Sequence, residues 1–178
     1  MSGVSVEYLY LVLEVPLVPL PAVEVSQSPV EKFREFLASR PELKRFSQPQ
    51  RELVEHVFAR HKHFDTNELL DDLKAANRSI SRATVYRTLK LLVDAGLLRR
   101  IEVGTRTVFD HDYGYPAHDH LVCTECGTMI EFQNPKLDDA LQEVASEHAF
   151  QAVGRSLVIR GICGNCNQTR AARRRLVM

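Results

Sequence analysis

Two pairs of cysteines carry the most specific chemistry in this sequence. Cys123 and Cys126 form one Cys-x-x-Cys pair, and Cys163 and Cys166 form the other. Four thiolates around one ion give the closed tetrahedral coordination of structural zinc. The long segment between the pairs is tolerated, because each doubling of a loop costs only about 0.6 kcal/mol. We therefore expect one structural Zn²⁺ per chain, with a dithiol redox switch and unligated buried cysteines as the alternatives.

A second group of potential ligands combines imidazoles with carboxylates. His118 and His120 alternate in an extended stretch just before the first cysteine pair, so both rings lie on one face. Glu131 follows on the next expected strand, and His63 and Asp110 from the front half of the chain would complete a set drawn from both halves. Three imidazoles and two carboxylates suit Fe²⁺ or Mn²⁺, and Zn²⁺ less well. A single histidine is more often an ordinary core residue, so the prediction rests on the cluster.

The front half contains the elements that must position some of these groups. Apolar residues recur there at helical spacing, and two short β-rich runs follow around a turn at Gly104-Thr105. Several helices followed by a hairpin are the order of a winged helix-turn-helix. We expect helices over residues 29–41, 47–61, 65–76 and 81–96, and hairpin strands over residues 97–103 and 106–110.

The rear half has a different pattern. Strand-like runs at residues 121–123 and 128–132 precede a helix around residues 137–145 and a strand at residues 156–162. The arginine-rich end after Cys166 is expected to be a solvated tail. The expected fold is α+β, with a poorly ordered extension at residues 1–26, a winged-helix domain at residues 27–110 and a second, small α/β domain at residues 111–178.

The helix expected at residues 81–96 has one apolar face and one mixed face. Around Val85, a step of 100° per residue places Leu89 and Leu92 on the buried side and cations with an aromatic ring on the other. Such a face suits the major groove of DNA, although periodicity alone fits a merely solvated helix equally well. The context of a preceding helix and a following wing favours DNA. The candidate DNA-binding residues are Arg51, Ser81, Arg82, Thr84, Tyr86 and Arg87.

Charge is unevenly distributed although the formal net charge is zero. Residues 26–100 carry 15 Lys and Arg against 10 Asp and Glu, a balance of +5, whereas residues 101–178 carry 8 against 10, a balance of −2. A basic front half fits a nucleic-acid partner. The apolar start lacks a basic signal-peptide region and is interrupted by prolines, so we expect a cytoplasmic protein with no membrane segment.

Seven short segments together match the pattern of a known family. They are Gln48-Pro-Gln-Arg51, His63-Phe-Asp-Thr-Asn-Glu-Leu69, Ser81-Arg-Ala-Thr-Val-Tyr-Arg-Thr-Leu89, Val108-Phe-Asp110, His118-Asp-His-Leu-Val-Cys-Thr-Glu-Cys-Gly127, Ile130-Glu-Phe132 and Cys163-Gly-Asn-Cys166. From about Pro29 to Cys166 the chain resembles the ferric uptake regulator family. The resemblance implies a winged helix, a dimerisation domain, structural zinc on the four cysteines, and a regulatory ion held between the domains by His63, Asp110, His118, His120 and Glu131.

Departures from the family pattern bear on the choice of metal. Iron-sensing members often carry Glu where Asp110 stands, whereas peroxide-sensing members carry Asp there and also at the position of Glu131, so the pattern is mixed. Several zinc-sensing members add a cysteine to the sensor, and none is available here. A further family site needs histidines at the positions of Ala117 and Arg155, so we expect that site to be absent although Asp119 and Asp138 are present.

Together these patterns predict a homodimeric, metal-responsive transcriptional repressor that binds a palindromic double-stranded DNA operator. The regulatory ion is expected to be Fe²⁺ or Mn²⁺. Zn²⁺ is expected to be able to occupy the same site in vitro. Peroxide-, manganese- or zinc-responsive regulation are alternatives within the family, and a thiol redox switch is the alternative of another class. An enzyme is not expected, because no nucleophile motif is visible and five protein ligands leave little room for a reactive water.

Overall fold

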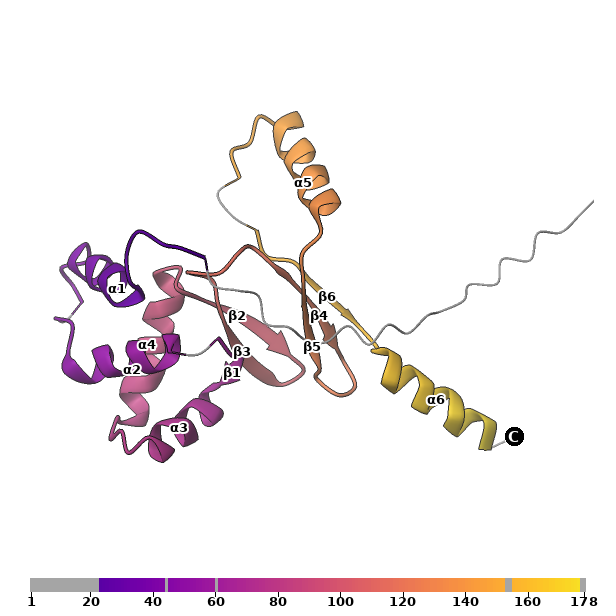
Figure 1. Cartoon of the computed structure of the whole chain (residues 1–178), viewed down its shortest axis with the longest axis horizontal. Coiled ribbons are helices and arrows are strands. Elements are labelled where there is room, and N and C mark those ends of the chain that lie inside the picture. The colour runs from indigo at the N-terminus through magenta and orange to yellow at the C-terminus, as the bar shows by residue number, and fades with distance from the viewer. Residues whose placement is uncertain (1–22, 44, 60, 153–154, 177–178) are drawn as a thin grey trace, which may run out of the picture.

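The computed structural model describes residues 23–43, 45–59, 61–152 and 155–176, with side chains described up to residue 170. Most of the expected N-terminal extension, residues 1–22, lies outside this range. The described chain is α+β, as predicted, and contains two three-stranded sheets. Figure 1 shows helices α1 to α4 gathered at one end, the two sheets in the middle, and helices α5 and α6 projecting from the other end.

Four helices build the front half: α1 (Pro29–Ala38), α2 (Gln48–Phe58), α3 (Thr66–Ala75) and α4 (Arg82–Asp94). Ser28 and Asp65 begin α1 and α3 with capping boxes, and the Ser81 hydroxyl accepts a hydrogen bond from the Thr84 amide at the start of α4. The apolar faces of the helices meet in one core, which includes Phe33, Leu37, Leu53, Val54, Leu69, Leu73, Val85, Leu89 and Leu92. The predicted helices are therefore present, each within a few residues of its expected ends.

The first sheet forms the wing. Strands β2 (Leu98–Val103) and β3 (Arg106–His111) pair antiparallel around a turn in which Gly104 has a φ of +61°. Between α2 and α3 lies a two-residue strand that the sequence did not predict, β1 (Phe64–Asp65), which pairs with β3 and gives the order β1-β3-β2. Two residues are too few to show a period in the sequence, so this strand could be found only from its partner.

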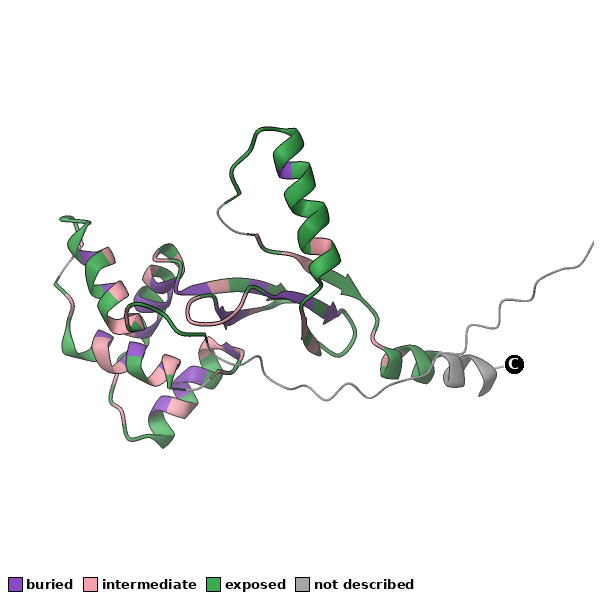
Figure 2. Ribbon diagram, turned by 45° about the horizontal axis from the view of Figure 1, so that its top comes forward, coloured by how far each residue is buried: buried purple, intermediate pink, exposed green. Residues whose placement is uncertain are grey.

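The second sheet has β4 (Asp119–Cys123) in the middle, β5 (Met129–Phe132) antiparallel on one side and β6 (Val158–Gly161) parallel on the other. Helix α5 (Pro135–Glu147) makes the crossover between β5 and β6. Figure 2 shows that α5 is almost wholly exposed, as is the described part of the last helix. Among the described residues, neither of these two helices forms a covering layer on the second sheet.

The end of the chain forms helix α6 (Gly164–Leu176), which begins inside the second cysteine pair. The expected solvated arginines, Arg173 to Arg175, lie beyond the residues whose side chains are described. The residues of α6 are mostly polar and charged, so the sequence shows no apolar stripe at helical spacing. No helix in the described part of the chain combines the length and apolar character needed to cross a bilayer.

Candidate metal centres

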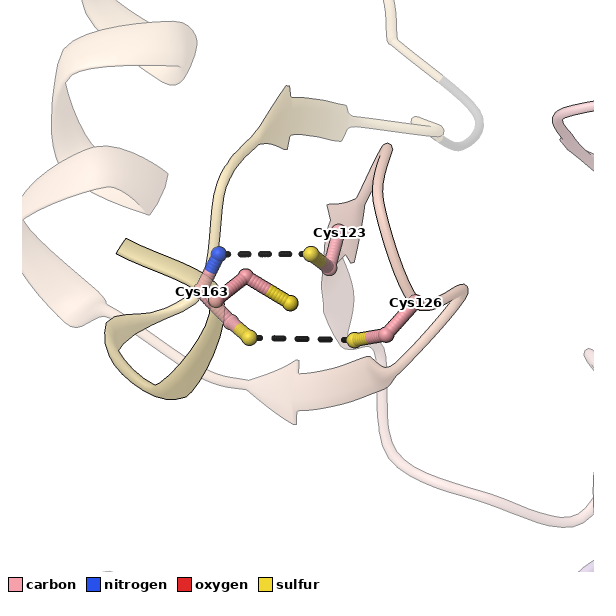
Figure 3. A group of neighbouring side chains, drawn as sticks. Cys123, Cys126 and Cys163 are labelled. Carbon is pink, nitrogen blue, oxygen red and sulfur yellow. Dashed lines mark hydrogen bonds between the residues drawn. The ribbon is translucent and has the colours of Figure 1, made fainter. Parts of the chain in front are cut away.

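The first centre brings all four cysteines together. One potential ligand atom from each of Cys123, Cys126, Cys163 and Cys166 lies within 4.8 Å of the others. Cys123 ends β4, Cys126 lies in the turn to β5, and the second pair follows β6, whose Gly161 is aligned with Cys123. Figure 3 shows the labelled thiols facing one another across this gap. The parallel pairing of β4 with β6 thus closes the long interval between the two pairs.

The thiols contact one another without forming a disulfide. Cys126 Sγ lies 3.7 Å from Cys163 Sγ, and the Cys163 amide donates to Cys123 Sγ over 3.3 Å. Backbone donors, from Cys163 above all, lower the pKa of Cys123 to about 6, whereas contact with the Cys163 and Cys126 thiols raises the pKa of Cys166 to about 12. Four sulfurs this close cannot all ionise without a cation between them, so the donor set fits a zinc ion.

The second centre unites groups from both halves of the chain. His63, Asp110, His120 and Glu131 each place one potential ligand atom within 4.8 Å of the others. His63 Nε2 lies 3.2 Å from His120 Nε2, 3.1 Å from Glu131 Oε1 and 3.2 Å from Asp110 Oδ1. His63 and Asp110 belong to the winged-helix part, and the other two belong to the second sheet.

Strand register explains why these distant residues meet. His120 and Glu131 are directly opposite each other on β4 and β5, so their side chains lie on the same face of the sheet. His63 comes just before β1, whose Phe64 is opposite Phe109 on β3, next to Asp110. Each half therefore supplies two donors from neighbouring strands.

His118 lies beside this group rather than within it. Its Nε2 is 3.0 Å from Asp110 Oδ2 and 2.6 Å from Arg99 Nη2, while its Nδ1 is 2.8 Å from the Pro116 carbonyl oxygen. Sequence reasoning missed Arg99, whose Nε also lies 2.7 Å from Asp110 Oδ2. The available signal was positional, because Arg99 is the direct cross-strand partner of Asp110 in the predicted hairpin.

Burial and hydrogen bonding together set the charges of this centre. Burial alone would raise the pKa of Asp110, but hydrogen bonds with His118 and His63 and the charge of Arg99 outweigh it and hold that pKa well below its usual range. Burial lowers the pKa of His120 to about 3. For His118, burial is outweighed by hydrogen bonds to Asp110 and to the Pro116 carbonyl, which raise its pKa. The centre thus presents an ionised carboxylate and a neutral imidazole.

Two buried oxygens of this centre fit a cation. Asp110 Oδ1 and Glu131 Oε2 are shielded from solvent and receive no well-aligned hydrogen bond from the described residues, although His63 Nε2 lies 3.2 Å from Asp110 Oδ1. Buried carboxylate oxygens are costly to leave without a donor or a cation. Imidazole nitrogens and carboxylate oxygens are the donors that Fe²⁺, Mn²⁺ and Zn²⁺ accept. The residues present therefore fit a divalent transition metal.

A third group, His61, His111 and Asp110, was not expected from the sequence. His61 stacks on Tyr115 with ring centroids 3.7 Å apart, and His111 Nε2 lies 3.0 Å from the Val57 carbonyl oxygen. Its only carboxylate is Asp110, which the second centre shares and which Arg99 already pairs. The rings of His61 and His111 both pack against Tyr115.

The further metal site, which lacks its two histidines in this sequence, is replaced by ion pairs. Asp119 is fully buried, and Arg155 Nη2 lies 2.8 Å from its Oδ2. The other arm of the same guanidinium, Nη1, pairs with Asp138 on α5. A guanidinium thus lies between the two carboxylates that the sequence marked as remnants of that site.

The candidate DNA-binding residues occupy the outer side of α4 and the start of α2. Tyr86 is 54% exposed, Ser81, Arg82 and Arg87 are exposed, and Thr84 is half-buried. Arg51 is half-buried with its guanidinium carbon 5.4 Å from the centre of the Phe46 ring. The α4 residues share one surface beside the wing, and their contacts with DNA stay a prediction.

The second sheet has an exposed apolar row on the face opposite to the metal donors. Leu121 is directly opposite Ile130 on one side and Ile159 on the other, so the three side chains form one row across β5, β4 and β6. All three are at least one-third exposed, and Ile159 is 47% exposed. Leu141 and Val144 on α5 are also exposed apolar residues.

Comparisons with known proteins agree with the two-part fold described above. The model of the Ferric uptake regulator family matches residues 44–160. The chain is 31% identical over 144 residues to the Ferric uptake regulation protein of Campylobacter jejuni subsp. jejuni, covering 80% of this chain and 90% of that protein. It is 38% identical over 110 residues to the Ferric uptake regulation protein of Bordetella parapertussis, covering 61% of this chain and 78% of that protein.

Solved structures give the same result for the fold. The ferric uptake regulator from Pseudomonas aeruginosa with manganese matches with a TM-score of 0.66 at 26% identity, over 78% of this chain and 99% of that one. The Helicobacter pylori ferric uptake regulator, described with three functional metal-binding sites, matches with a TM-score of 0.68 over 83% and 98% of the two chains. At 20% identity this second likeness concerns the fold alone.

Proposed function

Since this chain belongs to the ferric uptake regulator family, we propose that it is a cytoplasmic, homodimeric transcriptional repressor that binds its operator when the second metal centre holds Fe²⁺. Proteins of this family are metal-responsive DNA-binding regulators and not enzymes. The proposal goes further in naming the residues, the metal and the direction of regulation for this chain.

One observation carries the proposal: the second metal centre draws its donors from both halves of the chain. His63 and Asp110 come from the winged-helix part, and His120 and Glu131 come from the second sheet. His118 lies just before β4, with its Nε2 3.0 Å from Asp110 Oδ2. A divalent ion bound there would supply bonds that fix the angle between the two halves. These five residues would then hold α4 in a defined position, with Ser81, Arg82, Thr84, Tyr86 and Arg87 facing DNA and Arg51 near a phosphate.

The exposed apolar row supports the homodimer. Leu121, Ile130 and Ile159 form a continuous apolar row on a face of the sheet that the described residues leave exposed. A second copy of the chain can cover it with the same surface in a two-fold arrangement. Two α4 helices would then face half-sites about one turn of DNA apart, which requires a palindromic operator.

The donor set favours Fe²⁺ or Mn²⁺ over Zn²⁺ as the regulatory ion. Three imidazoles and two carboxylates, with no cysteine among the described residues of this centre, form a nitrogen and oxygen environment. The intrinsic affinity of nitrogen and oxygen ligands is higher for Zn²⁺ than for Fe²⁺ or Mn²⁺, so Zn²⁺ can occupy the centre in vitro. The four cysteines would hold a separate structural Zn²⁺.

Anaerobic gel-shift titration with Fe²⁺, Mn²⁺, Zn²⁺ and Ni²⁺ tests this function. We expect Fe²⁺ to increase operator binding by at least tenfold for the wild type and for His148→Ala, which removes an exposed histidine from the end of α5. His120→Ala should lose this stimulation while keeping one zinc per chain and the dimer. Stimulation of His120→Ala equal to that of the wild type would exclude the centre as the sensor.

A further inference from the structure

Arg99 lies inside the second metal centre. Its Nε is 2.7 Å from Asp110 Oδ2, and its Nη2 is 2.6 Å from His118 Nε2. Its side chain is only 13% exposed, and that of Asp110 is fully buried. Because the two residues are directly paired across β2 and β3, the hairpin itself holds the guanidinium against the carboxylate. A permanent positive charge therefore contacts two of the five donors assigned to the regulatory ion.

The protons in this contact follow from which groups can only donate or only accept. A guanidinium stays protonated and has no lone pair to offer. The Pro116 carbonyl oxygen only accepts, so His118 Nδ1, at 2.8 Å, carries a proton. His118 Nε2 lies 2.6 Å from Arg99 Nη2 and 3.0 Å from Asp110 Oδ2, so the guanidinium and the carboxylate both contact the ring nitrogen that would bind an ion. Arg99 thus occupies the same ring nitrogen of His118, and the same carboxylate oxygen of Asp110, that a metal ion would use.

We propose that Arg99 is a built-in competitor of the regulatory cation. It must leave Asp110 and His118 before a divalent ion can bind to them, because two positive charges cannot share these buried donors. The competition weakens ion binding and so sets the concentration at which the protein responds. This inference rests on the proposed regulatory centre and adds to it a residue from the wing.

Asp112 gives the guanidinium a second place to bind. Arg99 Nη1 already lies 4.0 Å from Asp112 Oδ1, and the Asp112 side chain is about half exposed, at 48%. A rotation of the Arg99 side chain would exchange the buried carboxylate of Asp110 for this solvated one. Since Arg99 belongs to β2, the exchange changes an ion pair inside the wing. Cation binding is thereby coupled to the hairpin beside α4.

Metal titration of the full-length, zinc-loaded protein tests the proposal, with Co²⁺ as the probe and its visible absorption as a readout independent of DNA. Arg99→Gln should bind Co²⁺ at least tenfold more tightly than the wild type. The matched control is Arg100→Gln, since Arg100 is the next residue, is exposed and pairs with Glu102 instead. It should bind within twofold of the wild type. Equal or weaker binding by Arg99→Gln would overturn the proposal.

A measurement on the wild type removes any dependence on how Arg99→Gln folds. The NMR signal of the Arg99 Nε proton should exchange slowly with water in the zinc-loaded protein without a second ion. Saturation of the second centre with diamagnetic Zn²⁺ should speed this exchange at least tenfold, and slow exchange after saturation would contradict the proposal.

Asp112→Asn should weaken Co²⁺ binding several-fold by removing the second partner of Arg99, and unchanged affinity would exclude this role of Asp112.

Glu131→Gln separates failure of this inference from failure of the proposed function. If Co²⁺ binds the wild type and Glu131→Gln equally, the second centre is not the binding site and both proposals fail. If Glu131→Gln weakens binding but Arg99→Gln has wild-type affinity, the regulatory centre stands and the competitor role of Arg99 falls.

Discussion

Arg155 binds two carboxylates that lie on different elements, Asp119 at the start of β4 and Asp138 in α5. The sequence marked this place as a metal site that had lost its histidines. In the structure the guanidinium lies between the remaining carboxylates and neutralises a fully buried Asp119. Arg155 therefore connects α5 to the sheet with a fixed positive charge, so this connection needs no ion.

Arg155→Ala should destabilise the rear half of the molecule. It would leave Asp119 buried without its partner, and breaking such a pair costs about 3 kcal/mol. Chemical denaturation of the zinc-loaded protein measures the change. The control is Arg170→Ala, which breaks an ion pair with Glu125 at the surface, where both side chains are exposed. That loss should be at most about 1 kcal/mol, and equal losses for the two variants would show that the Asp119 pair has no special importance.

The residues with strong chemical identity were predictable from the sequence, and their charged neighbour was not. The Cys-x-x-Cys pairs and the alternation of His118 and His120 have spacings that few other functions require. Arg99 has no such spacing, because an arginine on a wing strand is ordinary until its partner across the hairpin is known. The register of a hairpin depends on its turn, and a shift by one residue would place Arg99 on the other face.

Among the elements, those that begin with a capping residue were the most predictable. Asp65 accepts hydrogen bonds from the amides of Asn67 and Glu68 and pairs with Arg106 from the wing. It therefore fixes both the start of α3 and the position of the hairpin. In contrast, β1 is too short to show a period and α6 is too polar, so both depend on contacts that are distant in sequence.

Asp65→Ala should reduce the free energy of unfolding by about 1 to 2 kcal/mol at pH 7, the usual loss for an N-cap. Hydrogen bonds from the backbone, with Glu68 first and Asn67 also contributing, lower the pKa of Asp65 in spite of its burial, and Arg106 lowers it further. The stabilisation is therefore complete above the unfolded pKa of about 3.9 and disappears as the pH falls through the lower folded pKa. Urea denaturation of both proteins between pH 7 and pH 3 should show the difference narrowing only below about pH 4.

Asp71→Ala is the control variant for Asp65→Ala. Asp71 lies on the same helix and pairs with Lys74, but its side chain is 75% exposed. Its removal should change stability by less than about 0.5 kcal/mol at any pH. A constant difference between the wild type and Asp65→Ala down to pH 3 would show that the Asp65 charge has no part in the cap.

At the scale of the whole molecule, the two faces of the second sheet have separate tasks. One face carries His120 and Glu131 toward the winged-helix part, and the other carries the exposed row of Leu121, Ile130 and Ile159. Because side chains alternate along each strand, a single register places both sets correctly. The metal donors could be predicted from the sequence. The apolar row could not, because it depends on the parallel pairing of β6 with β4.

Ile159→Asp should convert the proposed dimer to a monomer, because it places a charge within the apolar row, at its end on β6. Sedimentation velocity at micromolar concentration measures the change. Gln48→Asp adds the same charge at an exposed position at the start of α2 and should leave the dimer intact. A dimer that persists in Ile159→Asp at the lowest measurable concentration would exclude this face as the interface.

Removal of zinc should affect the rear half first. The four cysteines connect the end of β4 to the start of α6, so a strong chelator or Cys163→Ser should release about one zinc per chain and loosen β6 and α6. Elemental analysis and hydrogen exchange measure the two effects, and Ser156→Ala, outside the cluster, is the control. Purified, reduced, folded protein with no zinc would contradict the assignment. Disulfide formation by mild oxidant at full zinc occupancy would favour the redox switch.

The parallel pairing of β6 with the central strand β4 has a consequence during protein synthesis. Every described residue of the α1–α4 core, including Tyr113 packed against it, precedes residue 114, whereas the second sheet needs its last strand, at Val158–Gly161. On the ribosome the part that recognises DNA can therefore fold long before the part that controls it. A message interrupted between these points would yield a recognition module with neither a zinc cluster nor a complete partner surface, and such fragments would need rapid proteolysis.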